Sequence, residues 1–125
     1  LDLARNADVA LLGIGNLDPA RSGLVKGGFL SPEALARLAA DGAVGDMGGH
    51  IFTGDGHLYD REYYERIIGV TLDDFKRIPK TIAVAAGVEK CAAICGGLRT
   101  GAVRILVTDD QTASGMLATE NNHDR

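Results

Sequence analysis

Residues 81–107 read TIAVAAGVEKCAAICGGLRTGAVRILV, and this stretch decides the fold class. Its two ends, 81–86 and 103–107, are short runs rich in Val, Ile and Ala, typical of strands buried on both faces of a parallel sheet. Residues 88–99 carry apolar side chains at helical spacing, and Gly101 can end a helix there. The stretch therefore predicts a strand–helix–strand unit with a right-handed crossover. The residues expected on the inner face of this helix are Val88, Cys91, Ala92, Cys95 and Leu98.

A third apolar run, VALLGI at 9–14, predicts the first strand of the same sheet. Ser-Pro at 31–32 provides the cap and first residue of a helix that ends near Gly42. Another helix follows the last strand, with Thr108 or Asp109 as its cap. The residues expected to face inward from these two helices are Leu35, Leu38, Ala39, Ala113, Met116 and Leu117.

The segment between the first and second strands predicts an excursion from the sheet. HIFTGDGHLYD at 50–60 contains two strand-like pieces around Gly-Asp-Gly at 54–56, which is a hairpin signal. TLDDF at 71–75 predicts a capped helical turn before Pro79. We therefore expect an α/β fold with a parallel-sheet layer, flanking helices and a β-hairpin excursion. Three parallel strands make a narrow sheet for such apolar sequences, so we expect further strands upstream of Leu1, which is not an initiator methionine.

The composition narrows the classes of function. The net charge is −4 and no basic cluster appears, whereas a DNA-binding module normally carries a basic face. Tryptophan is absent and aromatic residues make up 5%, so a stacking platform for nucleobases is not expected. No apolar run approaches the roughly 20 residues that span a bilayer, and no signal peptide is visible, so we expect a cytoplasmic protein without membrane contact. Residues 119–125 are expected to form a polar, frayed tail.

Cys91 and Cys95 lie four residues apart on the predicted helix. We interpret them as reduced, buried residues of a cytosolic protein. A metal pair or redox switch needs further ligands nearby, and none is close in the sequence. His50 and His57 flank the hairpin and are interpreted as surface residues, so neither a metal nor a cofactor is expected.

Three places follow the ends of the expected parallel strands, where open α/β sheets bind ligands. Gly13 and Gly15 let backbone N–H groups approach an anion, although an ordinary loop explains G-x-G equally well. Lys90 lies in the first turn of a helix, where the helix dipole disfavours a cation unless an anion binds there. An exposed lysine paired with a carboxylate explains Lys90 equally well. After the third strand, capping accounts for Thr108 and Asp109.

Asp46 lies in the glycine-rich stretch GAVGDMGGH at 42–50, where its carboxylate has room to accept hydrogen bonds from sugar hydroxyls. A turn-forming aspartate is the simpler interpretation. Lys26 in KGGFL is a second candidate for contacting an anion, or else a solvated loop lysine. No nucleophile–base pair or carboxylate dyad occurs at a convincing spacing. A lysine and an aspartate could still catalyse enolisation of a sugar phosphate, so an enzyme is the alternative function.

Four segments resemble, in their order and spacing, the sugar-binding domain of the SorC family of bacterial transcription regulators. They are ADVALLGIGNLDP, GAVGDMGGHIFTGDG, RIIGVTLDDFKRIPKTIAVAAGVEKCAAICGGLRTG and ILVTDDQTA. The resemblance implies a fold like that of sugar-phosphate isomerases and deaminases, with residues 1–118 as the C-terminal portion of a non-enzymatic domain that binds a phosphorylated sugar. It also implies a dimeric or tetrameric protein whose N-terminal helix-turn-helix domain, absent from this chain, binds operator DNA.

The same resemblance implies roles for individual residues. Asp46 matches the acidic residue that accepts hydrogen bonds from ligand hydroxyls, and Lys90 matches a lysine that contacts phosphate. Gly13 and Gly15 match the GIG loop of the family, although Asn16 stands where serine is frequent and leaves the hydrogen bonding there open. Lys26 lies where some members have a basic residue near a second phosphate. A structural or oligomerisation module without a ligand site is a third alternative.

Overall fold

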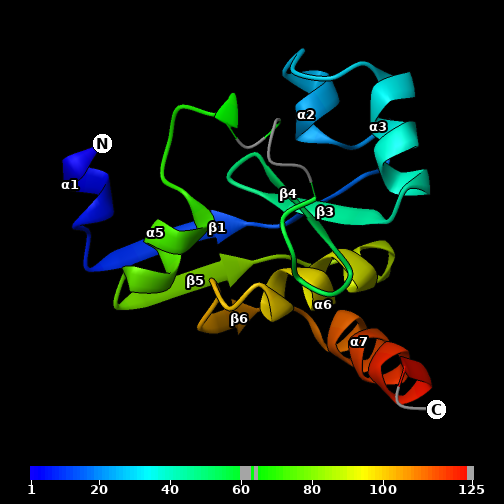
Figure 1. The fold of residues 1–125 in the computed structure, drawn as a ribbon. Helices are drawn as coiled ribbons and strands as arrows, with labels where there is room; N and C mark the ends of the chain where they lie inside the picture. The colour runs from blue at the N-terminus through cyan, green and yellow to red at the C-terminus, as the bar shows by residue number, and fades with distance from the viewer. Residues whose placement is uncertain (60–62, 64, 124–125) are drawn as a thin grey trace.

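The structure is a computed structural model that describes residues 1–59, 63 and 65–123. Figure 1 shows two small sheets with helices around them. One sheet is parallel, with the strand order β1–β5–β6, and the other is antiparallel, with the order β2–β3–β4. The strands are β1 (Val9–Gly13), β2 (Gly15–Asn16), β3 (Ala43–Met47), β4 (His50–Thr53), β5 (Lys80–Val84) and β6 (Ile105–Val107). The predicted α/β fold and its three parallel strands are confirmed.

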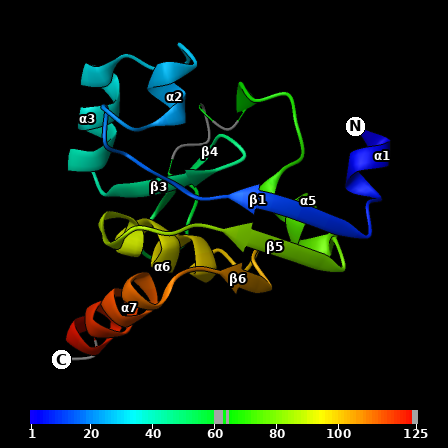
Figure 2. The same ribbon diagram turned by 180° about the vertical axis from the view of Figure 1, so that it is seen from behind.

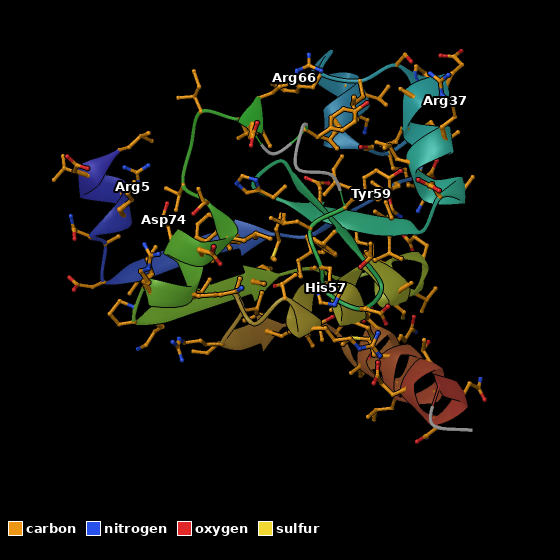
Figure 3. The ribbon with its side chains drawn as sticks, in the orientation of Figure 1. Arg5, Arg37, His57, Tyr59, Arg66 and Asp74 are labelled. Atoms are coloured by element: carbon orange, nitrogen blue, oxygen red, sulfur yellow. The ribbon has the colours of Figure 1, made fainter. Side chains whose placement is uncertain are left out.

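Short helices flank the two sheets. They are α1 (Asp2–Arg5), α2 (Gly23–Lys26), α3 (Pro32–Ala40), α5 (Leu72–Arg77), α6 (Cys91–Arg99) and α7 (Asp110–His123), with a 3-10 turn, η1 (Val88–Lys90), before α6. The predicted caps are present: the side chain of Ser31 accepts a hydrogen bond from the N–H of Ala34, and Thr71 forms a reciprocal capping box with Asp74. Figure 3 shows Arg5 of α1 turned toward Asp74, which it contacts at 3.2 Å.

The strand–helix–strand unit forms as predicted, but the inner face of its helix differs. Val88 is 60% exposed because η1 has about three residues per turn, which takes Val88 out of phase with the residues of α6. Ala92 is also exposed, and Ala93 and Ile94 are buried instead. Cys91 and Cys95 are buried and Leu98 packs against the core as predicted, so the buried surface of the helix differs from the prediction in including Ala93 and Ile94 in place of Val88 and Ala92.

Three further expectations concern the helices. Cys91 and Cys95 are free thiols with exposed fractions of 8% and 5%, so their predicted burial is confirmed. Ala39 of α3 and Leu117 of α7 are exposed instead of facing inward, because each of these helices packs through a narrow stripe. The polar residues 119–123 belong to helix α7 and do not form the frayed tail that was expected; 124 and 125 lie outside the described residues. No helix in the described ranges is long and apolar enough to cross a membrane.

The predicted turn at 54–56 is present, but the longer β-hairpin of this segment lies just before it in the chain. This longer hairpin joins β3 to β4 and turns at Gly48 and Gly49, whose φ angles are +57° and +84°. The predicted turn at 54–56 follows β4, where Phe52 forms an isolated antiparallel bridge with Leu58. Glycines at 48 and 49 therefore act as turn residues, and the stretch before them is a strand.

Helices α5 and α6 pack on the same face of the parallel sheet. The main buried cluster joins Phe75 of α5, Ile94 of α6 and Ala83 of β5, and it continues to Phe52 of β4. The opposite face is not covered, so the expectation of strands buried on both faces is wrong for the described residues: Leu11 is 71% exposed. A second cluster packs α3 against the antiparallel sheet, and its buried residues are Leu17, Leu35, Leu38, Ala43 and Ile51.

Strand β3 lies very close to helix α6 and to β2. A Cβ atom at Gly45 would lie 2.6 Å from the carbonyl oxygen of Gly15 and 2.8 Å from Cβ of Ala93. Such distances are shorter than van der Waals contact, so only glycine fits without a shift of the strand or the helix. Gly45 therefore fixes the spacing between the two sheets and α6.

We expect Gly45→Ala to lower the free energy of unfolding by about 1–3 kcal/mol, the usual cost of adding a methyl group to filled space. Gly23→Ala is the control, because a Cβ atom there would meet no atom within 4 Å. The measurement is the urea-unfolding midpoint of both variants in the natural protein. An unchanged midpoint for Gly45→Ala would contradict the close packing.

Candidate functional site

The two sheets meet at the end of β1, where residues 13–15 lead into β2. Gly15 is the register partner of Asp46 on β3. A Cβ atom at Gly15 would lie 2.5 Å from Oδ1 of Asp46, so the absence of a side chain lets the carboxylate lie over the backbone of β2. A Cβ atom at Gly13 would meet no atom within 4 Å, so packing does not require glycine there.

Asp46 lies on a strand and not in the turn or loop that its glycine-rich surroundings indicated. Along β3, the buried residues Ala43, Gly45 and Met47 alternate with the half-buried Val44 and Asp46. Gly45 faces Ala93 of α6, and neighbouring residues of a strand point to opposite sides. Asp46 therefore points away from α6, toward the side of β3 that remains partly open.

Lys90 reaches the same junction from the end of η1. Its Nζ donates a hydrogen bond to the carbonyl oxygen of Ile14 at 3.1 Å. The neighbouring Glu89 instead forms an ion pair with Arg21 at 2.6 Å. Lys90 is half-buried, which differs in exposure from the alternative of an exposed lysine paired with a carboxylate. The carboxylate of Asp46 is near enough to attract it.

Burial raises the pKa of the Asp46 carboxyl above its ordinary value. Three interactions act in the opposite direction: a hydrogen bond from the backbone N–H of Gly49 and the attraction of Lys90 and His50. His50 is not the predicted surface residue, because it is 2% exposed and its Nε2 lies 2.8 Å from the carbonyl oxygen of Val70. The site therefore holds a partly desolvated carboxyl group beside two basic side chains.

Asp46 also lines an open cavity of about 540 Å³, a volume in the range of small-ligand sites. Arg66 is the other charged residue in its described lining, and Figure 3 shows Arg66 beside helix α2. Most of the remaining wall is apolar, formed by Leu24, Phe29, Leu30, Ile51, Ile67 and Ile68. The cavity thus offers the carboxylate of Asp46, the guanidinium group of Arg66, the hydroxyl of Tyr63 and a large apolar surface.

The structure brings four of the five predicted site residues together. Gly13, Gly15, Asp46 and Lys90 meet where the sheets join, although only Asp46 is part of the cavity lining. Lys26 is exposed at the end of α2 and does not line the cavity. The sequence did not predict Arg66 as a site residue. The segment around it has no clear periodicity, and no motif marks this arginine as a ligand contact.

This arrangement is suited to a polar, anionic ligand. An ionised carboxylate accepts hydrogen bonds from hydroxyl groups, and ammonium and guanidinium groups donate charge-assisted hydrogen bonds to anions. No cluster of three metal-binding side chains occurs in the part of the chain that the structure describes.

Comparison with known proteins adds three kinds of similarity. A family model described as "Putative sugar-binding domain" matches residues 1–118. The transcriptional regulator LsrR of Enterobacter sp. strain 638 is 35% identical over 117 residues, which cover 92% of this chain and 36% of LsrR. EryD, the erythritol catabolism regulatory protein of Brucella abortus, is 31% identical over 122 residues, covering 96% of this chain and 37% of EryD. The chain thus spans little more than a third of the length of these relatives.

Solved structures agree in fold as well. The sugar-binding domain of a transcriptional repressor from Vibrio fischeri superposes with a TM-score of 0.82 at 36% identity, covering 97% of this chain and 48% of that one. The full-length sorbitol operon regulator SorC from Klebsiella pneumoniae gives a TM-score of 0.80 at 30% identity, covering 93% of this chain and 37% of SorC.

We expect Asp46→Asn to raise the free energy of unfolding at pH 7, because burial disfavours the ionised carboxyl group. The raised pKa means that the folded state favours the protonated acid, so the cost of ionisation develops as the pH rises from the ordinary pKa of an aspartate to the raised pKa and is complete above it. Below about pH 4 the aspartate is protonated in the unfolded chain as well, and the gain from asparagine should be smallest.

Urea unfolding at pH 4 and pH 7 measures this difference. Asp55→Asn is the matched control, because Asp55 is exposed in the turn after β4 and its replacement removes the same charge. A lower stability of Asp46→Asn at pH 7 would contradict the desolvation of Asp46.

Proposed function

We propose, because the chain belongs to the sugar-binding domain family of SorC-type transcription regulators, that it is part of an effector domain that senses a phosphorylated sugar. The observation that carries this proposal is the meeting of Asp46 and Lys90 at the junction formed by residues 13–15. These residues lie 44 positions apart in the chain and share no local structural reason to meet. No catalytic residue, metal or cofactor is part of the proposal.

Lys90 is proposed to contact the phosphate group. Its ammonium group has three donors, and one hydrogen bond to Ile14 leaves donors for an anion. Gly13 and Gly15 support this role, because a backbone without side chains allows an anion to approach closely. An anion at this position would also compensate the cation at the start of a helix.

Asp46 is proposed to accept hydrogen bonds from the sugar hydroxyls, and Arg66 to face the ligand from the opposite part of the cavity lining. Lys26 is the proposed contact for a second phosphate, since Gly23 and Leu24 of the same helix line the cavity. The apolar wall favours a small sugar that presents a hydrocarbon edge, because polar groups there would lose hydrogen bonds to water.

An isomerase or deaminase of related fold is the second candidate function. Asp46 and Lys90 could together move a proton next to a carbonyl group, which is the specific observation in its favour. The similarity to LsrR, EryD and SorC supports the regulator, since all three are regulators. Turnover of the bound sugar phosphate by the natural protein would favour the enzyme.

We further propose that the chain is the C-terminal portion of this effector domain in a longer, cytoplasmic, dimeric or tetrameric protein. A separate upstream domain would bind operator DNA in that protein. The length of the relatives supports a longer protein, because the chain spans 36% of LsrR. The net charge of −4 supports a separate DNA-binding domain, because this chain has no basic cluster for phosphates of DNA.

We expect Lys90→Ala to weaken binding of the preferred sugar phosphate by about ten- to a hundredfold, because a charge-assisted hydrogen bond contributes roughly 1.5–3 kcal/mol. Asp46→Ala should weaken sugar-phosphate binding more than binding of inorganic phosphate. Calorimetry on the natural protein with a panel of sugar phosphates measures both effects.

Lys76→Ala is the control, because Lys76 pairs with Asp73 on α5 and its replacement removes the same charge away from the site. Lys90→Gln retains a donor without the charge and should bind with intermediate affinity. If Lys90→Ala binds as tightly as the parent while Lys76→Ala also does, the assignment of the phosphate to Lys90 is wrong.

A further inference from the structure

One face of the parallel sheet consists mainly of branched apolar side chains, with Lys80 at one end of the middle strand. Leu11 pairs with Ile82, and Ile82 pairs with Ile105; one step along, Val84 pairs with Val107. Paired residues in neighbouring strands point to the same face of a sheet, as do alternate residues of one strand. The bare sheet face therefore consists of the apolar residues Val9, Leu11, Ile82, Val84, Ile105 and Val107, together with Gly13 and the exposed Lys80.

This face is exposed, unlike the other face of the same strands. Leu11 is 71% exposed, and Val9, Val84 and Val107 are each 50% exposed, whereas Ala83 on the opposite face is fully buried. Figure 2 looks at the bare sheet face and shows no described helix in front of β1, β5 and β6. Contiguous apolar surface of this kind is unusual on a soluble protein and marks a contact.

The topology explains why the chain does not cover this face itself. The connections from β1 to β5 and from β5 to β6 advance in one direction across the sheet. Parallel crossovers share one hand, so connections that advance in the same direction lie on the same face. Helices α5 and α6 both follow this rule, and the other face is left to polypeptide from outside these connections.

We propose that the bare sheet face is covered by the polypeptide that precedes this chain in the longer protein, through the apolar side of a helical layer. The sugar-binding domain from Vibrio fischeri supports this occupant, because this chain covers only 48% of that chain. Further strands can pair with the edge strand β1, and each added parallel strand requires a crossover, usually a helix on a face of the sheet. The inference rests on the proposed function only in taking the chain as part of a longer domain.

The test measures the reactivity of a thiol placed on this face in the full-length natural protein. Leu11→Cys is compared with Leu117→Cys, a matched site on α7 whose exposed fraction is 68% against 71% for Leu11. Labelling is followed at each position by mass spectrometry, so that Cys91 and Cys95 can stay in place, and each rate is divided by the rate in urea. Should Leu11→Cys fail to fold, Val107→Cys replaces it.

We expect the thiol at 11 to react at least about a hundredfold more slowly than the thiol at 117, at every protein concentration, because labelling requires local opening. Equal rates at 11 and 117 would overturn the inference, and so would a natural protein without preceding residues. Protection at 11 that disappears on dilution would assign the face to a second copy and also overturn it. Sugar-phosphate affinity, measured on the same variants, reports separately on the proposed function.

Discussion

The position of the candidate site depends on one packing constraint: strand β3 has to fit between β2 and helix α6. Gly45 meets this constraint because no side chain separates the strand from Ala93 or from the backbone of Gly15. The next residue along the strand, Asp46, has to point the other way, and there it lies over Gly15, the second glycine of the contact. The packing that closes the core therefore also fixes where the carboxyl group lies, and a shift of β3 would move both.

Local signals were sufficient to predict the parallel strands and the helix caps from the sequence. Apolar runs and capping residues act over a few positions, so residues 81–107 were identified without knowledge of the rest of the fold. Strand β3 could not be predicted in this way, because its glycines have no periodic pattern and its extended shape comes from pairing with β2 and β4. The same limit applies to Lys90: its position near a helix start was visible, but its hydrogen bond to Ile14, 76 residues away, was not.

The expectation that the parallel strands are buried on both faces was wrong for a different reason. A run of branched apolar residues indicates that both faces of a strand avoid water, but it does not say which polypeptide covers each face. Helices α5 and α6 cover one face, whereas Val84 and Leu11 on the other remain exposed in the described residues. On the inference drawn above, the amino-acid pattern reports on the complete domain of the longer protein. Burial in the structure reports only on what these residues can cover by themselves.

The raised pKa of Asp46 connects the fold to the proposed function. A carboxyl group that burial keeps from water costs folding free energy when it is ionised, and Lys90 and the N–H of Gly49 offset only part of that cost. A neutral residue of the same shape would pack at position 46 without this cost of ionisation. A ligand whose hydroxyl groups donate to the carboxylate would replace the lost water and, on the proposed function, stabilise the folded domain as well as bind to it. On the proposed function, hydrogen bonds from the ligand therefore account for a charge that by itself opposes the packing around it.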